Sequence, residues 1–175
     1  MRLMDRGGEK VTSSEFEKIY CEYFDGVYRY LLGLSGNRYI AEEMTSDTFF
    51  KAMQGIDNFK GNCQMKSWLC QIARNTYYSY LRKSKNVNLV NEIPETENAE
   101  EKSIEEQILK KDTSMKIHSV LHYLEEPYKE VFTLRVFGEL SFNEIGRIFE
   151  KTENWACVTY YRARKKIQER MEEIQ

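Results

Sequence analysis

The sequence predicts an all-α protein composed of two small helical domains. Its 175 residues contain only two prolines and nine glycines, too few turn-forming residues for an all-β fold. Apolar residues recur three and four positions apart along several segments, which is the period of an amphipathic helix. Residues 85–102 lose this period and include Pro94, so we expect a flexible linker there, between domains at 12–84 and 103–175.

The first domain is expected to hold three helices. Ser14 and Glu17 form the Ser-x-x-Glu pattern of a capping box, and an apolar stripe follows as far as Leu32. A second helix is predicted over 39–55, and a third over 67–81 with a serine as its cap. Each helix carries one apolar face, so the three together can enclose a core.

In the second domain, helical periodicity resumes over 103–123. Another helix is predicted between Pro127, which suits a first turn, and Gly138, which suits a C-terminal cap. Its buried stripe is supplied by large apolar residues between these two positions.

The last segment predicts a helix-turn-helix. Ser141 and Glu144 form another capping box that opens a short helix, residues 150–153 form a turn, and a longer basic helix runs to about Met171. Gly146 in the short helix would allow a close approach of the two helices. In this arrangement the second helix enters the major groove of DNA, because only an α-helix or a β-ribbon fits its width.

The charge pattern indicates a polyanionic partner. The net charge is only −2, but residues 58–91 contain six basic residues and no acidic one, whereas 92–107 contain seven glutamates and a single lysine. Basic residues return in the last helix, at Arg162, Arg164, Lys165 and Lys166. Two basic surfaces on either side of an acidic connector suggest two sites for one polyanion, although solvated helix faces would give similar clusters.

Several function classes are excluded by the same residues. No apolar run approaches the roughly 20 residues of a membrane helix, and the N-terminus lacks the apolar core of a secretion signal, so we expect a soluble, cytoplasmic protein. Four cysteines without a CxxC pair argue against a disulfide framework or a zinc site. His118 and His122 lack the HExxH context. With no catalytic triad, phosphate loop or nucleotide fingerprint, we expect no enzyme, no metal and no cofactor.

Several motifs occur together and in a fixed order. They are Ala41-Glu42-Glu43-Met44-Thr45-Ser46-Asp47-Thr48-Phe49; Phe59-Lys60-Gly61; Trp68-Leu69; Ile72-Ala73-Arg74-Asn75; Ser141-Phe142-Asn143-Glu144-Ile145-Gly146; and Tyr161-Arg162-Ala163-Arg164. With these motifs the chain resembles the extracytoplasmic-function (ECF) class of bacterial sigma factors from about residue 16 to 171. The resemblance implies a sigma factor that binds core RNA polymerase, recognises −35 and −10 promoter elements and promotes strand opening at the start of transcription.

The resemblance also implies three sets of site residues. Core polymerase would bind the second helix through Glu42, Glu43, Thr45, Asp47, Thr48, Phe50 and Lys51. In region 2, the −10 element and its unpaired non-template strand would meet Lys60, Asn62, Gln64, Lys66, Arg74, Asn75, Tyr78, Arg82 and Lys83. In region 4, the double-stranded −35 element would meet Thr152, Asn154, Trp155, Thr159, Arg162 and Lys165.

The physical chemistry of these residues agrees with such roles. Cations bind the backbone of a single strand, aromatic rings stack on its bases, and the amides of Asn62 and Gln64 can hydrogen-bond an exposed base edge. Trp68 and Tyr77 lie on the apolar stripe and are expected in the core instead, whereas Tyr78 is expected to contact DNA.

The chain departs from the family at the start of its last helix. Where the family has a small residue and then a Lys or Arg, this chain has Asn154-Trp155-Ala156-Cys157. The missing cation removes one expected DNA contact, so a −35 sequence preference does not transfer.

Family behaviour further implies a cognate anti-sigma factor, often membrane-anchored, and no small-molecule substrate. Two alternatives stay open from the residues alone. One is a stand-alone helix-turn-helix regulator that uses only the second domain to bind DNA. The other is a helical adaptor that binds no DNA.

Overall fold

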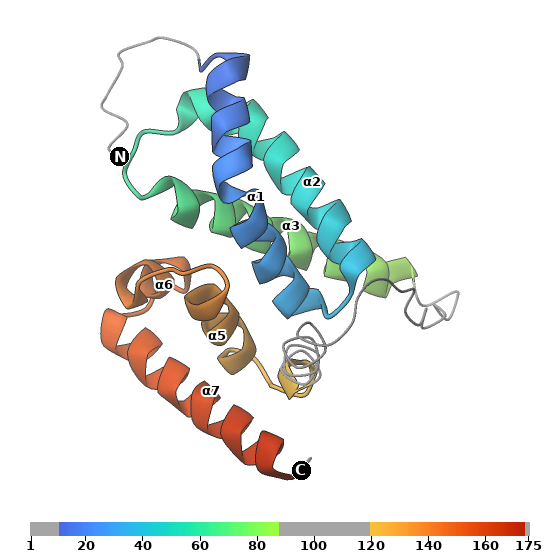
Figure 1. Ribbon diagram of the computed structural model, residues 1–175, viewed down its shortest axis with the longest axis vertical. Coiled ribbons are helices and arrows are strands. Elements are labelled where there is room, and N and C mark those ends of the chain that lie inside the picture. Colours follow the sequence, from blue (N-terminus) through green and yellow to red (C-terminus); the bar gives the residue numbers. More distant parts are fainter. Residues whose placement is uncertain (1–10, 88–119, 174–175) are drawn as a thin grey trace, which may run out of the picture.

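The computed structural model describes residues 11–87 and 120–173, and every regular element in these two ranges is a helix (Figure 1). The elements are α1 (Ser13–Ser35), α2 (Arg38–Gly55), the 3-10 turn η1 (Ile56–Asn58), α3 (Met65–Val87), α5 (Tyr128–Val136), α6 (Phe142–Ile148) and α7 (Glu153–Glu173). The all-α prediction is confirmed for these ranges. Most of the predicted linker, the predicted helix before residue 120 and His118 lie outside the described residues.

The N-terminal cap of α1 lies two residues earlier than predicted. Thr12 rather than Ser14 is the cap: its Oγ1 accepts a hydrogen bond from the Glu15 N–H at 3.3 Å, and a Glu15 carboxylate oxygen accepts one from the Thr12 N–H at 3.0 Å. The two Ser/Thr-x-x-Glu patterns overlap in the sequence. The earlier one is favoured because Val11 and Phe16, which flank it, both pack on the core as a hydrophobic staple.

Helices α1, α2 and α3 form the N-terminal unit, which comprises the described residues 11–87 (Figure 1). Its core includes the fully buried side chains of Tyr30, Leu31 and Leu69, and each leucine stabilises the fold by about 1.5–3 kcal/mol relative to an exposed one. Asn37 caps α2 by accepting a hydrogen bond from the Ile40 N–H at 3.1 Å. The unit presents the outer faces of α2 and α3 to its surroundings.

The C-terminal unit, residues 120–173, contains α5 and the predicted helix-turn-helix of α6 and α7. Ser141 and Glu144 form the expected capping box. Gly146 lies against the turn between the helices, where a Cβ atom would come within 2.8 Å of the Lys151 carbonyl oxygen. The close approach that Gly146 was expected to permit is therefore a contact between α6 and the backbone that leads into α7. Gly138 follows the end of α5 and donates its N–H to the Thr133 carbonyl oxygen at 3.0 Å.

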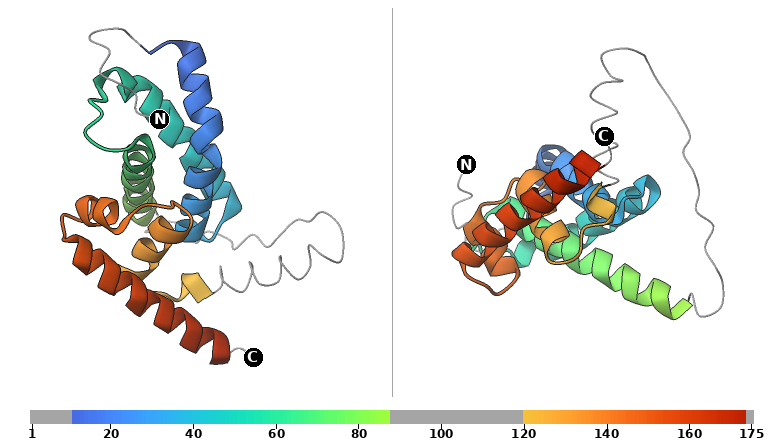
Figure 2. Two further views of the ribbon diagram at one scale, coloured as in Figure 1. Left: turned by 60° about the vertical axis from the view of Figure 1, so that its left-hand side comes forward. Right: turned by 90° about the horizontal axis from the view of Figure 1, so that it is seen from below.

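The two units pack directly against each other. Helix α5 lies between α7 and the N-terminal unit (Figure 1; Figure 2, left). One hydrophobic core cluster runs through both units, and its buried members from the C-terminal unit include Val131, Leu134, Leu140 and Ile145. At the contact of α1 with α5, Gly33 is buried, and a Cβ there would lie 2.7 Å from the Thr133 Cγ2. The main core is thus shared by the two units, and Val120, Leu121 and Ile167 of the C-terminal unit form a second, smaller cluster.

Candidate functional site

The outer face of α2 is an exposed stripe of acidic and apolar side chains. The predicted residues Glu42, Glu43, Asp47, Phe50 and Lys51 are all exposed, and Phe50 is 57% exposed. Positions three and four apart share one helix face, so the acidic residues and Phe50 form a continuous surface. We call this surface the α2 stripe.

Two of the predicted polymerase contacts face the core instead of the surface. The side chains of Thr45 and Thr48 are fully buried, and their hydroxyls donate hydrogen bonds to the carbonyl oxygens of Ala41 and Met44 at 2.6 Å. Both threonines therefore belong to the core and are not available at the surface.

The α2 stripe also holds two residues that the motif did not identify. Tyr39 is 74% exposed and Met53 is 50% exposed, at opposite ends of the stripe. Their spacing from Phe50, eleven positions before and three after, fits the same helix face and could have indicated them. The stripe is therefore more apolar than the sequence motif suggests, as expected of a protein-binding surface.

The loop before α3 and the start of that helix carry the first set of predicted −10 contacts. Lys60, Asn62 and Gln64 are exposed, and Gly61 adopts the left-handed conformation with φ of 67°. Lys66 is only partly exposed and forms an ion pair with Glu139 of the C-terminal unit. Three of these four side chains are therefore available to a ligand, and the fourth is engaged across the interface.

The remaining −10 candidates follow one face of α3. Arg74, Asn75, Tyr78 and Arg82 line a shallow open pocket together with Leu81. Lys83, which follows Arg82 in the sequence, is exposed. The structure thus brings four of the predicted residues together around one concave surface, which we call the α3 face.

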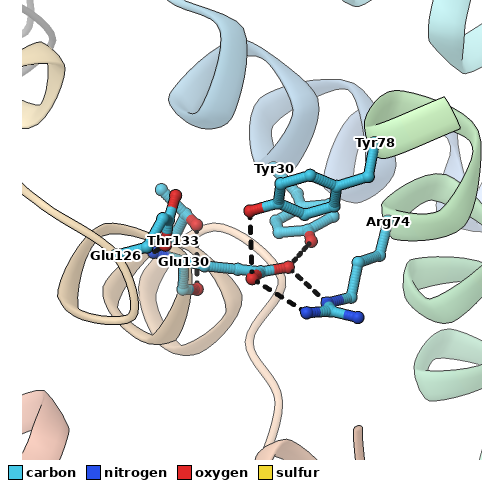
Figure 3. Close-up of polar contacts among 6 residues, drawn as sticks. All are labelled: Tyr30, Arg74, Tyr78, Glu126, Glu130 and Thr133. Carbon is cyan, nitrogen blue, oxygen red and sulfur yellow. Dashed lines mark hydrogen bonds and ion pairs between the residues drawn. The ribbon is translucent and has the colours of Figure 1, made fainter. Parts of the chain in front are cut away.

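Glu130 of α5 binds two residues of the α3 face, Arg74 and Tyr78 (Figure 3). Its carboxylate is 2% exposed and accepts four hydrogen bonds from the N-terminal unit. Arg74 donates from Nε at 2.6 Å and from Nη2 at 3.4 Å, while the hydroxyls of Tyr30 and Tyr78 donate at 3.1 and 3.2 Å. Two residues predicted to contact DNA therefore bind a carboxylate of the same chain.

The donor groups of this cluster keep their protons at neutral pH. Burial, followed by the nearby Glu130 carboxylate, raises the pKa of Tyr30 and of Tyr78 well above the ordinary value. For Arg74, burial lowers the pKa, but the hydrogen bond to Glu130 and the charges of Glu130 and the two tyrosines together outweigh it, so the pKa is raised. The guanidinium stays charged and both phenols stay protonated, so all three groups can donate.

Glu130 lies outside all of the motifs and predicted site residues. It lies 56 positions from Arg74 and 100 from Tyr30, in a helix that carries none of the DNA-binding motifs. The only local signal for Glu130 is its position on the inward side of an amphipathic helix. A charged residue is rarely buried there unless it has a partner.

The outer face of α7 carries the predicted −35 contacts. Asn154, Arg162 and Lys165 are exposed. Thr152 is exposed as well, and its Oγ1 caps α7 by accepting a hydrogen bond from the Trp155 N–H at 3.1 Å. The first turn of the helix and its basic residues are thus open to a ligand.

Two predicted −35 residues are turned inward. Thr159 is 6% exposed, and Trp155 is half-buried with its ring against Phe149, at 5.1 Å between centroids. Val158 and Tyr161, 39% and 57% exposed, lie on the outer face instead. The departure at Trp155 is therefore explained by packing within the helix-turn-helix.

Within residues 11–87 and 120–173, His, Cys, Asp and Glu side chains do not gather in groups of three that could hold a metal ion. In the same ranges, none of the helices combines the length and apolar character needed to cross a bilayer.

Comparisons with known proteins agree with the two-unit organisation. Residues 19–87 match the family Sigma-70 region 2, and residues 114–167 match Sigma-70, region 4. RNA polymerase sigma factor YlaC of Bacillus subtilis (strain 168) is 28% identical over 158 residues, which cover 89% of this chain and 91% of the relative. ECF RNA polymerase sigma factor SigM of the same organism is 27% identical over 155 residues, covering 86% and 91%.

A solved structure has the same fold. The sigma factor RpoE in complex with the anti-sigma factor NepR, from Bartonella quintana, aligns with a TM-score of 0.70 at 22% sequence identity. The alignment covers 91% of this chain and 98% of the other.

Proposed function

We propose that this chain, which belongs to the sigma-70 family of RNA polymerase sigma factors and to its extracytoplasmic-function class, binds core RNA polymerase and directs it to specific promoters. The N-terminal unit is region 2 and the C-terminal unit is region 4. The observation that carries the proposal is the presence of both regions, in order, in one chain. We assign the chain no catalytic step of its own, and we place its action in the cytoplasm, where polymerase works.

Core polymerase would bind the α2 stripe. Its acidic residues Glu42, Glu43 and Asp47 surround the exposed Phe50, and such a mixture of charged and apolar groups suits a specific protein interface. Tyr39 and Met53 extend the proposed interface, whereas Thr45 and Thr48 are left out because they are buried.

Region 2 would bind the −10 element as a melted strand. The α3 face combines two arginines, an amide and an aromatic ring around one shallow pocket, which is the chemistry that binds unpaired bases and their phosphates. Lys60, Asn62 and Gln64 in the preceding loop are exposed and can contact the same strand.

Region 4 would read the −35 element with the outer face of α7. Asn154, Val158 and Tyr161 are exposed near the start and middle of the helix, where base edges come into reach in a helix-turn-helix. Arg162 and Lys165 continue the same face and would bind phosphates, which position the protein without reading the sequence.

An anti-sigma factor is the proposed regulator. The sigma factor RpoE of Bartonella quintana is known in complex with the anti-sigma factor NepR. By extension, we propose a partner of this type for the present chain, and no small-molecule substrate.

Co-elution with bacterial core RNA polymerase on gel filtration tests the proposed function. We expect the wild-type chain to co-elute and the double variant Glu43→Ala/Asp47→Ala to co-elute weakly, because it removes two charges from the α2 stripe. The matched control is Glu17→Ala/Glu22→Ala, which removes two exposed acids from α1 and should behave as wild type. A folded wild-type chain that fails to bind would contradict the proposal and favour the stand-alone DNA-binding regulator.

A further inference from the structure

We propose that Glu130 is an autoinhibitory latch: in the free chain it holds region 4 against the α3 face and masks the surface that binds the melted −10 strand. This inference rests on the proposed function, because it concerns the regulation of the same DNA-binding surface. It requires that Arg74 and Tyr78 bind either Glu130 or DNA, but not both.

The geometry of the carboxylate supports the latch. Glu130 Oε1 accepts hydrogen bonds from Tyr30 and Arg74, and Oε2 accepts from Tyr78 and Arg74, so these four hydrogen bonds all come from region 2. Tyr30, Tyr78 and Arg74 all point toward the carboxylate (Figure 3). Separation of the regions would remove all four hydrogen bonds at once.

The carboxylate also occupies the position that a DNA phosphate would take. It presents two anionic oxygens to the guanidinium of Arg74, as a phosphate group does. The Arg74 guanidinium lies 5.3 Å from the Tyr78 ring centroid, so the cation and the aromatic ring form one composite site. Glu130 therefore competes for the pair of groups that a single strand would use.

Two further contacts between the regions reinforce the closed state. Gly33 of α1 leaves no room for a side chain opposite Thr133, which lies one turn beyond Glu130 on α5. At the other end of the interface, Lys66 pairs with Glu139, whose carboxylate is 71% exposed. The buried latch and the exposed ion pair offer a matched comparison, because both join the same two regions.

The −35 surface and the α2 stripe stay open in this conformation. Asn154, Arg162 and Phe50 are all exposed, whereas Arg74 and Tyr78 are only partly so. The closed chain can therefore meet polymerase and duplex DNA before its −10 surface is released.

Binding of a short, fluorescein-labelled single-stranded DNA of mixed sequence to the full-length chain tests the latch by fluorescence anisotropy. We expect weak binding by wild type and about tenfold tighter binding by Glu130→Gln, because the apparent affinity rises with the fraction of open chain. Glu139→Gln is the control: it also removes an anionic partner from the interface, but at an exposed pair, and should stay within about twofold of wild type.

Carbodiimide crosslinking reports closure independently of DNA. The reagent joins a carboxylate to a contacting amine, so the closed wild-type chain should yield an amide between Lys66 and Glu139. The Lys165–Glu169 pair within α7 is the internal standard, because it does not span the regions. In Glu130→Gln the ratio of the first crosslink to the second should fall several-fold.

Gly33→Ala provides a second route to opening, since it leaves Glu130 unchanged and separates the regions by steric contact. It should lower the crosslink ratio and tighten binding of the single-stranded DNA as Glu130→Gln does. The inference is wrong if both variants bind the DNA as wild type does, or if no form of the chain binds it. Co-elution with core polymerase tests the proposed function separately, so a failure of the latch can be distinguished from a failure of the proposed function.

Discussion

The Nε atom of Arg74 lies 2.6 Å from the Oε1 atom of Glu130, and this ion pair joins region 2 to region 4 across 56 positions of sequence. Glu130 is 2% exposed and Arg74 is 29% exposed, so the pair is largely removed from water. A buried carboxylate without its partner is costly because its charge is no longer compensated. The two residues should therefore contribute to stability as one unit.

A double-mutant cycle measures this coupling. We expect Arg74→Ala and Glu130→Ala each to destabilise the chain, and the double variant to lose less than the sum of the two. The coupling free energy should be about 1–3 kcal/mol in urea unfolding, the range for residues that share a hydrogen-bond network.

The cycle of Lys66→Ala and Glu139→Ala is its control. This pair also joins the two regions, but it is exposed and should show a coupling of less than about 1 kcal/mol. Equal coupling free energies in both cycles would mean that burial does not make the Arg74–Glu130 pair stronger than the exposed Lys66–Glu139 pair.

Two glycines of α1 should respond in opposite directions to the same substitution. Gly33→Ala places a Cβ 2.7 Å from the Thr133 Cγ2 and 3.0 Å from the Phe137 ring, so the side chains at the end of α5 must shift to admit it. Gly26→Ala meets only the flexible Lys66 side chain, at 3.8 Å. We expect Gly33→Ala to destabilise by about 1–3 kcal/mol through overpacking.

Gly26→Ala should instead stabilise by about 0.5–1 kcal/mol, the gain in helix propensity. Thermal unfolding of the two variants beside wild type checks both values. In the combination Gly33→Ala/Thr133→Ser, which removes the clashing methyl but keeps the hydroxyl, part of the lost stability should return. If Thr133→Ser restores none of the stability lost in Gly33→Ala, the clash with the Thr133 methyl is not the cause of the loss.

The sequence predicted the elements better than the contacts between them. The Ser141–Glu144 box and the residues around Gly146 have local signals, and the helix-turn-helix follows from them. The inward turn of Thr45 and Thr159 could not be read from motifs, because a motif specifies residue types and not the side of the helix that neighbouring elements cover. The contact of Glu130 with Arg74 is non-local and depends on how two regions pack, which no local period encodes.

Two neighbouring arginines of α7 should differ in their effect on DNA binding. Arg162 follows Tyr161 on the outer face, whereas Arg164 lies about 120° from Val158 around a helix with 3.6 residues per turn. With two duplexes that differ only in the −35 sequence, polymerase carrying Arg162→Ala should bind both more weakly. The slope of log affinity against log salt should fall by about one, as for one lost phosphate contact.

Arg164→Ala is the matched control and should change neither the affinity nor the salt slope appreciably. A changed preference between the two duplexes in Arg162→Ala, at constant salt slope, would assign Arg162 to a base edge instead of a phosphate.

The Tyr77 hydroxyl should make the stability of the chain fall in alkaline solution. Burial, and then the nearby Glu126 carboxylate, raises the pKa of Tyr77 from 10.0 to about 12. Between these pH values the unfolded chain releases the phenolic proton and the folded chain retains it, so the free energy of unfolding decreases as pH rises. The contribution of Tyr77 is complete below pH 10.0 and falls by at most about 1.4 kcal/mol per pH unit above it.

Tyr77→Phe isolates this contribution from that of other tyrosines. At neutral pH the variant should be less stable by about 1 kcal/mol, because it loses the hydrogen bond from the hydroxyl to the Leu34 carbonyl oxygen at 3.3 Å. Urea unfolding between about pH 8 and 11 should show this deficit shrinking above pH 10, since the phenylalanine has no proton to lose while wild type is destabilised. A deficit that stays constant across the whole range would show that the Tyr77 hydroxyl has the same pKa in the folded and unfolded chains. That outcome would contradict the effect expected from the burial of Tyr77.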